Sequence, residues 1–399
     1  MFSVCNHTAL AGSRVAVSLA ALDLGASPFA VGLLLSFYGL LPMFLSVAGG
    51  RWIDRIGMRV PMLAGTGLLT FGVVVPFLGW DIGALYLASV TIGLGFMAFH
   101  LAVQKAAGVI GGAPTRKLNF SLLALGFSIS GFIGPTLAGV TIDLLGHRAA
   151  FGLLALAPLA AWFGLRRYPF EAHLPHVPPP QPAAAAPGRV LDLLDTPELR
   201  RMYLSVTLLS SAWDLHQFLV PLYGAKIGLS ASKIGLVLSA FALATFVVRL
   251  ALPLITRRVA EWPLILAAMA CAALVYTVYP FFPTLPAMIA LSFALGLGLG
   301  TAQPMVMVVM HHAAPPARVG EAAGLRLTLI NGTQTFLPSA FGAFGGVFGL
   351  ASIFWGTAAL VGAGVWYAGR GLRAEGRLGH AALRPEGGPG LASDDDLRT

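Results

Sequence analysis

The sequence predicts an all-α polytopic membrane protein, with twelve transmembrane helices in two pseudo-symmetric six-helix bundles. Three observations predict this fold class. Hydrophobic residues make up 57% of the chain and charged residues only 10%, whereas soluble domains are about 25% charged. Long apolar runs alternate with short charged connections, and the second half of the chain repeats features of the first. The mean hydropathy of +0.81 excludes a soluble domain.

Each apolar run is long enough to cross the membrane. A helix rises 1.5 Å per residue, so about 20 apolar residues cross a hydrocarbon core of about 30 Å. Connections between the runs are mostly short, which favours antiparallel neighbours. The predicted spans are residues 2–22, 28–50, 60–79, 83–104, 118–142, 149–166, 202–223, 232–255, 262–281, 285–310, 320–344 and 347–369.

Composition excludes several classes of function. The net charge is +9, but the basic residues lie singly at the ends of apolar runs, so a nucleic-acid partner is not expected. Cys5 and Cys271 both lie in apolar runs, which predicts neither a disulfide framework nor a metal site. No phosphate-binding loop or hydrolase motif occurs, so neither direct ATP use nor an enzyme is expected. Arg14 interrupts the first apolar run, so the N-terminus does not read as a cleaved signal peptide.

Basic residues are unevenly divided between the two sides of the predicted bundle. Because cytoplasmic connections are enriched in Lys and Arg, the richer side is predicted to be cytoplasmic, in a plasma (inner) membrane. Both termini lie on that side, since the number of spans is even. The poorer side carries only Arg148, Lys226 and Lys233. The richer side carries Arg51, Arg55, Arg59, Arg116, Lys117, Arg166, Arg167, Arg189, Arg200, Arg201, Arg257, Arg258, Arg318 and the arginines of the C-terminal tail.

The connection between the second and third spans contains a charged, glycine-bounded motif. Gly50 is expected to let a helix end pack closely, and Gly57 to permit a tight turn. Asp54 is expected at a helix N-terminus or paired with a neighbouring arginine. The alternative is an ordinary positively charged loop. The residues that fill the spacing G-x-x-x-D-R-x-G-x-R are Gly50, Asp54, Arg55, Gly57 and Arg59.

This motif resembles the signature loop of the major facilitator superfamily, and the resemblance extends from about Leu10 to Gly369. It implies a bacterial-type secondary transporter, similar to drug and metabolite exporters, whose two halves rock about a central site. It also implies that the loop acts in conformational gating, by stabilising the outward-facing state through ionic contacts on the cytoplasmic side.

The fifth span carries small residues and a proline. Gly126, Gly131, Gly134, Pro135 and Gly139 resemble the glycine-proline motif of the superfamily's antiporter branches. Small residues let helices approach closely, and proline permits a bend. A generic close-packed helix explains the pattern equally well.

One long connection divides the chain. The predicted domains are an N-terminal bundle over 1–168, a cytoplasmic linker over 169–200, a C-terminal bundle over 201–370, and a disordered cytoplasmic tail over 371–399. The linker is rich in proline and alanine and cannot form a core. A short amphipathic piece follows it at Val190–Leu199.

The two halves share glycines, prolines and serines at a spacing of 203 positions. The pattern is typical of parallel six-helix repeats. By the same spacing, Arg201 maps to a position before Met1, so the first helix lacks a cytoplasmic turn and we expect the natural start to lie upstream. The second copy of the signature loop keeps Arg257 and Arg258 but loses the aspartate and the glycines. The matched pairs include Gly25 and Gly228, Gly32 and Gly235, Ser36 and Ser239, Pro135 and Pro338, and Gly139 and Gly342.

Asp214 is the most telling ionisable residue, because it is predicted about 20 Å into the membrane. Ser210, Asp214 and Gln217 share one helical face, and His216 points elsewhere. Arg14 maps onto Gln217 by the repeat, so an Arg14–Asp214 pair near the centre is expected. The functional interpretation is that Asp214 carries a proton or that Arg14 binds an anionic substrate. The alternative is a structural ion pair.

Further polar residues complete the candidate site. The resemblance implies that the first, fourth, seventh and tenth helices line the cavity. Trp213 could stack on a substrate or simply pack, and His100 is as compatible with packing as with a site. Arg249 and Arg326 lie near cytoplasmic helix ends, where snorkelling or gate pairing is expected. The candidates for substrate binding and proton coupling are Arg14, His100, Trp213, Asp214, His216, Gln217, Gln303, Asn331 and Gln334.

These features together predict a secondary transporter for a small molecule, driven by an ion gradient, expected to be that of protons, without a cofactor or metal. Proton-coupled efflux is favoured over uptake because of the fifth-span motif. A proton symporter for uptake is the alternative, and a non-transporting membrane sensor is the alternative from another class. The expected partners are the substrate and the lipid bilayer, and the protein is expected to be a monomer.

Overall fold

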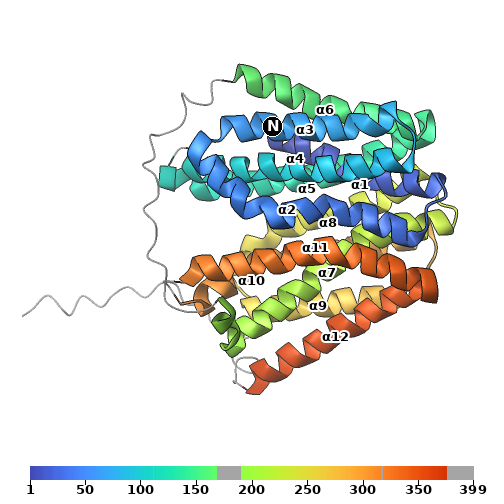
Figure 1. The fold of residues 1–399 in the computed structure, drawn as a ribbon. Coiled ribbons are helices and arrows are strands. Elements are labelled where there is room, and N and C mark those ends of the chain that lie inside the picture. The colour runs from blue at the N-terminus through green and yellow to red at the C-terminus, as the bar shows by residue number, and fades with distance from the viewer. Residues whose placement is uncertain (111, 169–189, 316–317, 375–399) are drawn as a thin grey trace, which may run out of the picture.

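The computed structural model describes residues 1–110, 112–168, 190–315 and 318–374, and these residues form twelve α-helices and no strand (Figure 1). Two short 3-10 helices, η2 (Val190–Leu194) and η3 (Tyr279–Phe281), accompany them. The α-helices are α1 (Phe2–Asp23), α2 (Pro28–Ile56), α3 (Arg59–Leu78), α4 (Ile82–Val109), α5 (Gly112–Leu145), α6 (His147–Arg167), α7 (Pro197–Lys226), α8 (Ala231–Ile255), α9 (Glu261–Val278), α10 (Leu285–Ala313), α11 (Val319–Phe348) and α12 (Leu350–Ala374).

These helices correspond one to one to the predicted spans. Nine of those described are long and apolar enough to cross a membrane by their own composition. The helices α1, α7 and α11 are not among the nine, although they have 22, 30 and 30 residues. They carry Arg14, Asp214 and Arg326, and their polar residues lower the mean hydropathy. A spanning helix accommodates such residues when they face the protein interior.

The helices form two groups of six. Figure 1 shows α1–α6 in its upper part and α7–α12 below them, with α2 and α11 side by side between the groups. We call α1–α6 the N-terminal half and α7–α12 the C-terminal half. The end of the bundle where α6 ends and α7 begins is the linker face, and the opposite end is the short-loop face. The connections at the short-loop face follow α1, α3, α5, α7, α9 and α11.

The repeat predicted at 203 positions is present in the backbone. The helices α2 and α8 begin at Pro28 and Ala231, and α4 and α10 begin at Ile82 and Leu285, each pair 203 positions apart. The left-handed glycines repeat as well. Gly25 and Gly228 have φ values of 78° and 77°, and Gly146 and Gly349 have 85° and 84°. Only glycine adopts this region without strain, so equivalent corners of the two halves need equivalent glycines.

The helices α5 and α8 form one close contact between the halves, near the short-loop face. Gly235 lies against the carbonyl of Pro135, and Gly139 lies against that of Ala231, so closely that a Cβ on either glycine would clash. The Thr136 and Ser239 hydroxyls share a hydrogen bond of 2.6 Å across the same interface. Here the small residues of the fifth span bring the two halves together.

The helices α2 and α11 repeat that contact. Gly32 lies against the carbonyl of Pro338, and a Cβ on Gly342 would lie 2.5 Å from the carbonyl oxygen of Pro28. The Ser36 and Ser339 hydroxyls are 2.7 Å apart. We call the α5–α8 and α2–α11 contacts the two seams. The residues at these contacts are among those that match at a spacing of 203 positions. The repeated residues therefore lie where the two halves meet.

The signature motif differs in form from the expected loop. The helix α2 continues through Gly50, Asp54 and Arg55, and only Gly57 and Met58 separate it from α3. Gly57 makes the turn with φ of 82°. A Cβ on Gly50 would meet nothing within 4 Å, so the close packing expected at this glycine is absent. The side chain of Asp54 lies outside the described residues.

The motif also touches the neighbouring helix of its own half. Arg59 donates a hydrogen bond of 3.1 Å from Nη2 to the carbonyl of Arg166, at the end of α6. Arg51 and Arg55 are exposed. The cytoplasmic gating role predicted for these residues stays a prediction.

The linker and the tail are only partly described. Residues 169–189 and 375–399 lie outside the described residues, so the predicted tether and disordered tail stay predictions. The amphipathic piece divides into η2 and the start of α7, which begins at Pro197, earlier than the predicted domain boundary. The helix α12 likewise runs on to Ala374.

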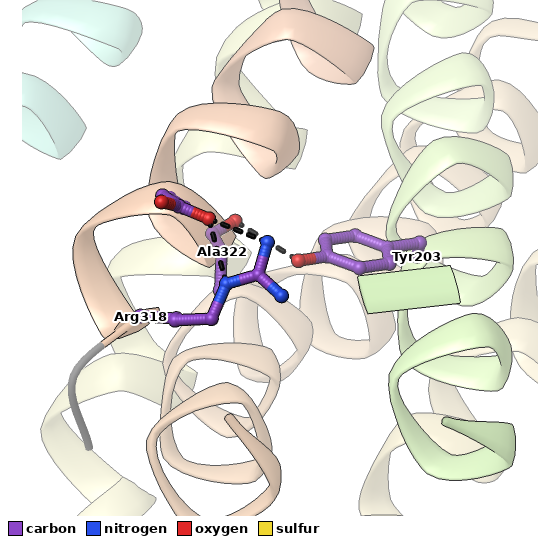
Figure 2. Close-up of polar contacts among 4 residues, drawn as sticks. Tyr203, Arg318 and Ala322 are labelled. Atoms are coloured by element: carbon purple, nitrogen blue, oxygen red, sulfur yellow. Dashed lines mark hydrogen bonds and ion pairs between the residues drawn. The ribbon is translucent and has the colours of Figure 1, made fainter. Parts of the chain in front are cut away.

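The start of α11 is fixed to α7 at the linker face. The Tyr203 hydroxyl donates a hydrogen bond of 3.2 Å to the carbonyl of Ala322 (Figure 2). Beside it, Nη2 of Arg318 lies 2.7 Å from Oε2 of Glu321. This contact lies within the C-terminal half and joins α7 to α11 at the linker face.

Candidate functional site

A central cavity of about 800 Å³ lies between the two halves. Its walls come from α1 and α5 of the N-terminal half and from α7, α8, α10 and α11 of the C-terminal half. Most of the wall is apolar, and hydroxyl and amide side chains interrupt it. The aromatic lining residues are Phe120, Phe127, Trp213 and Phe241.

The cavity is closed toward the short-loop face. Its lining residues come mainly from the part of each helix nearer the linker face, such as His7 in α1 and Met307 in α10. The two seams occupy the other ends of α2, α5, α8 and α11. Toward the linker face, the lining reaches Phe120 and Leu250, whose side chains are 42% and 58% exposed. This conformation therefore gives access from the linker face.

Three arginines line the cavity. Arg14 comes from α1, Arg249 from α8 and Arg326 from α11, and all three side chains are partly buried. The guanidinium of Arg14 lies over the ring of Tyr38, 5.9 Å from its centroid. Arg249 donates from Nη1 to Oγ of Ser128 at 3.0 Å. Snorkelling or gate pairing was expected for Arg249 and Arg326, and the structure shows both arginines lining the cavity, with Arg249 bonded across the two halves.

Asp214 lies in a second, smaller cavity of about 70 Å³. Its side chain is only 2% exposed. Oγ1 of Thr333 in α11 lies 3.1 Å from Oδ2 of Asp214 and 2.7 Å from the carbonyl of Ile330. Ser210 lines the same small cavity, one turn before Asp214, as the helical periodicity predicts.

Two side chains line both cavities. Trp213 and Gln303 are shared between them, so they form the boundary between Asp214 and the central cavity. The indole of Trp213 also packs edge-on against Phe241, with ring centroids 4.6 Å apart. Gln217 lines the central cavity but not the small one. A proton moving between the cavity and Asp214 would pass this boundary.

Arg14 and Asp214 are neighbours across the halves. Arg14 lines the central cavity and Asp214 the small one, and Trp213 and Gln303 line both. The two described side chains form no ion pair within 4.0 Å. The expected ion pair is therefore absent, although both groups face the interior.

The structure places three candidates away from the central cavity. His216 is 1% exposed, hydrogen-bonds to Ser292 at 3.0 Å and stacks on Phe241. His100 lies 2.7 Å from Gln104, between Nε2 atoms, and its ring packs against Phe96. Both therefore serve helix packing, contrary to the lining positions expected for them. Asn331 is not a lining residue of either cavity.

The structure also adds residues to the candidate site. Gln334 lines the small cavity as expected, and Thr333 joins it. His7 lines the central cavity and packs on Phe127, 4.7 Å between ring centroids. An arginine on an otherwise apolar face is the sequence signal that could have placed Arg249 and Arg326 here. Among the described residues, no group of three or more His, Cys, Asp or Glu side chains is arranged to hold a metal.

The sequence model of the Major Facilitator Superfamily matches this chain in two overlapping stretches, residues 1–331 and 203–388. The chain belongs to the major facilitator superfamily. The family assignment agrees with the all-helical architecture and with the resemblance of the signature motif, and it makes this protein a membrane transporter by family.

One curated relative matches part of the chain. Over 141 residues the chain is 25% identical to the "Fosmidomycin resistance protein" of Escherichia coli (strain K12). That match covers 33% of this chain and 34% of the relative, so it spans about a third of the curated relative's length.

Solved structures match nearly the whole chain. A POT family transporter in complex with a thioalcohol conjugated peptide aligns with a TM-score of 0.75 at 14% identity, over 94% of this chain and 95% of that one. A bacterial homolog of the human lysosomal transporter Spinster, in an inward-facing and unoccupied conformation, aligns at 0.74 and 12%, over 93% and 96%. The nucleoside transporter NupG (D323A mutant) aligns at 0.70 and 14%, over 92% and 98%. At these identities the likeness shows the fold alone.

Proposed function

We propose that this superfamily member is a proton-coupled secondary transporter that exports a small molecule across the plasma membrane by alternating access. The observation that carries the proposal is the central cavity between two repeated halves, closed at one face, with the buried Asp214 beside it. A site enclosed by two rigid halves changes its access when one half rocks against the other. The ion gradient supplies the driving force without a cofactor, and the protein acts as a monomer.

Asp214 is the proposed proton carrier. An ionised carboxylate in the membrane interior is costly, so such a residue takes up a proton readily or marks a transport path. The Thr333 hydroxyl has one proton and two acceptors within reach, Asp214 at 3.1 Å and the Ile330 carbonyl at 2.7 Å. With Asp214 ionised, Thr333 donates to the carboxylate. With Asp214 protonated, the acid donates to Thr333, which then donates to Ile330. Both charge states keep a hydrogen bond.

Two observations support export from the cytoplasm. The partial relative is a resistance protein, and the small residues of α5 lie in a seam between the halves. The basic side of the bundle coincides with the linker face, and this supports a cytoplasmic position for that face and for both termini. The cavity would then open to the cytoplasm in this conformation.

One observation favours the alternative of proton symport. An anion bound at Arg14 would repel an ionised Asp214, so anion and proton would bind to the same state. Symport requires this positive linkage, whereas antiport requires the two ligands to exclude each other.

Flux in proteoliposomes tests the proposal. The purified protein is reconstituted, a pH gradient is imposed, and currents are recorded while a panel of small molecules is applied. Substrate movement against its own gradient, driven by protons and abolished when the pH gradient is collapsed, is expected. The direction of proton movement relative to substrate separates antiport from symport. Absence of any gradient-driven flux, with binding retained, would favour the non-transporting sensor.

Orientation is tested separately in intact cells. Single cysteines at Arg257 and Lys233 lie at the linker face and the short-loop face, and both side chains are exposed. A membrane-impermeant thiol reagent is expected to label the Lys233 position and not the Arg257 position. The opposite labelling would contradict the proposed topology.

A further inference from the structure

The charge of the central cavity has one sign. Arg14, Arg249 and Arg326 line it together with His7, and no carboxylate is among the described residues of its wall. Asp214 lies behind Trp213 and Gln303 in the smaller cavity. Three guanidinium groups in one partly buried space repel one another unless something neutralises them.

The guanidinium groups have donors to spare. Nε of Arg14, and Nε and Nη1 of Arg326, are buried and meet no hydrogen-bond acceptor. None of the three arginines forms an ion pair within 4.0 Å with a described carboxylate. A buried polar group without a partner is expensive, and a buried charge more so. The three arginines of the central cavity therefore need a negatively charged group with several hydrogen-bond acceptor atoms.

The arginines do not belong to the repeated scaffold. At a spacing of 203 positions, Arg14 corresponds to Gln217, Arg249 to Ser46, and Arg326 to Leu123. Each seam residue has a small residue or a proline at the equivalent position of the other half. None of the three arginines has a basic residue at its equivalent position. Structural needs common to both halves thus do not explain the arginines.

The arginines also come from both sides of the cavity. Arg14 belongs to the N-terminal half, whereas Arg249 and Arg326 belong to the C-terminal half. His7 lies on α1 two turns before Arg14 and packs on Phe127. Arg249 donates a hydrogen bond to the next residue of α5, Ser128, so both arginines lie near His7. A ligand that contacted all three would hold the halves together and remove the repulsion that opposes their closure.

We propose that the cavity binds a small organic oxyanion, a carboxylate, phosphonate, phosphate ester or sulfonate, through Arg14, Arg249 and Arg326. The fork of N–H groups on a guanidinium matches the paired oxygens of these groups. The aromatic wall formed by Phe127, Trp213 and Phe241 would receive the apolar body of the ligand. A volume of about 800 Å³ admits a molecule of metabolite size. The inference rests on the transport function proposed above, but not on its direction.

Equilibrium binding tests the inference independently of transport. The probes share one phenyl body and differ in the head group: phenylphosphonate, benzenesulfonate, benzoate, neutral benzamide and cationic benzylamine. Thermal shifts of the purified protein, and quenching of its tryptophan fluorescence, give the affinities. The oxyanions are expected to bind at least tenfold more tightly than benzamide, and benzylamine is expected not to bind. Equal binding of the neutral probe, or no shift by any oxyanion, would overturn the proposal.

Variants locate the binding to these arginines. Arg14→Gln, Arg249→Gln and Arg326→Gln are each expected to weaken oxyanion binding about tenfold or more, since hydrogen bonds between ionised partners are involved. The matched control is Arg257→Gln, an exposed arginine just beyond α8, which should leave the affinity unchanged. If a Gln variant does not fold, the Lys variant keeps the charge and loses the fork, and an intermediate affinity is expected. Unchanged affinity in all folded Gln or Lys variants would overturn the proposal.

Two further arms separate the remaining outcomes. In nanodiscs made only of zwitterionic lipid, the oxyanion probes are expected to bind. If added anionic lipid leaves their affinity unchanged, the ligand is a free anion, whereas competition by the anionic lipid assigns the site to a lipid headgroup. Flux assays with the same probes separate the site from the transport function. Oxyanion binding without flux keeps the anion site and removes the transport proposal, whereas flux that is indifferent to all three arginines keeps transport and removes the anion site.

Discussion

At the scale of single residues, Asp214 shows how its helix accommodates an acid that alone would disfavour membrane insertion. The side chain is 2% exposed and its hydrogen-bond partner, Thr333, comes from another helix. A carboxyl that keeps one hydrogen bond in either protonation state can change its charge without rearranging its surroundings. This property suits the proton-carrying role proposed for Asp214.

Asp214→Asn is expected to abolish proton-driven transport, with a loss of at least tenfold in gradient-driven flux. The amide has nearly the same size but does not titrate, so exchange of substrate across the membrane without a gradient is expected to persist. Proteoliposome flux and counterflow measure the two activities. The control is Asp23→Asn, an exposed carboxylate at the end of α1, and undiminished proton-driven flux in Asp214→Asn would remove the assignment.

Asp143 is a second acid with a defined contact. Its carboxylate accepts hydrogen bonds from the backbone N–H groups of Ala231 and Ser232, at 3.0 and 2.8 Å. The acid sits near the end of α5 and caps the first turn of α8, which belongs to the other half. The side chain of Ser230, the N-cap residue of α8, makes no capping bond of its own. A helix of one half is therefore capped by the other half, and this bond must break when the short-loop face opens.

Asp143→Ala is expected to shift the protein toward the state that is open at the short-loop face. Loss of a helix cap costs about 0.5–2 kcal/mol. Here only the conformation in which the seam is closed loses this stabilisation. Spin labels at Leu144 and Lys233, both exposed, report the distance across the seam, and a longer component is expected. Asp81→Ala is the control, because Asp81 caps α4 within its own half, with its Oδ1 2.9 Å from the N of Ala84. A distance distribution identical to that of the control would contradict the assignment.

At the scale of the helix, glycine acts in two different ways. Gly342 and Gly346 lie one turn apart on α11. A Cβ at Gly342 would lie 2.5 Å from the Pro28 carbonyl oxygen of α2, whereas a Cβ at Gly346 would meet nothing within 4 Å. The first glycine permits a close approach of two helices, and the second has no such neighbour.

The same substitution at these two positions is expected to change stability in opposite directions. Gly342→Ala forces the seam apart, at an expected loss of about 1–3 kcal/mol. Gly346→Ala relieves the entropic disadvantage of a helical glycine and gains up to about 1 kcal/mol. Thermal unfolding of the two variants in the same detergent measures the difference. Equal unfolding midpoints would show that the seam does not limit stability.

At the scale of the whole molecule, the two seams close the same face of the bundle. They are equivalent under the repeat, so the rocking proposed for the two halves would open or close both at once. The cavity faces the opposite end, at the linker face. Alternating access then requires both seams to separate as the linker face closes.

Locking one seam is expected to stop transport. The Ser36 and Ser339 hydroxyl oxygens are 2.7 Å apart, so the double variant Ser36→Cys, Ser339→Cys, with Cys5 and Cys271 replaced by serine, is expected to form a disulfide under oxidation. Flux should fall to background on oxidation and return on reduction. Each single-cysteine variant serves as the control. Full flux in the oxidised, cross-linked protein would rule out alternating access through this seam.

The sequence predicted the architecture well because membrane helices obey a simple rule. The hydrocarbon core demands long apolar helices, and the helix boundaries follow from where charge and glycine interrupt them. The predicted spans correspond to the observed helices, although α2 and α5 extend further toward the linker face than predicted. Those extensions carry charged or polar residues, so hydropathy alone ends the span too early. Several residues matched by the repeat lie in the seams, because close helix approach admits only small side chains, but the repeat did not predict that the two halves meet there.

The candidate site was predicted less completely, for a physical reason. Periodicity fixes which residues share one face of a helix, as for Ser210 and Asp214, but it does not say what that face meets. His216 and His100 face neighbouring helices, whereas Arg249 and Arg326 face the cavity. Hydropathy assigns an isolated polar residue the same value whether its side chain meets a partner helix or an open cavity.

By itself the sequence determined the membrane class, the helices, the basic side of the bundle and the pairing of equivalent glycines, since each of these follows from local chemistry and solvent. Only the tertiary structure decided which face is closed, that Asp214 lies behind Trp213 and Gln303, and that three arginines from two halves share one cavity. These facts depend on how distant helices are rotated and packed against one another, and that rotation follows from the sum of many contacts between helices rather than from any single segment.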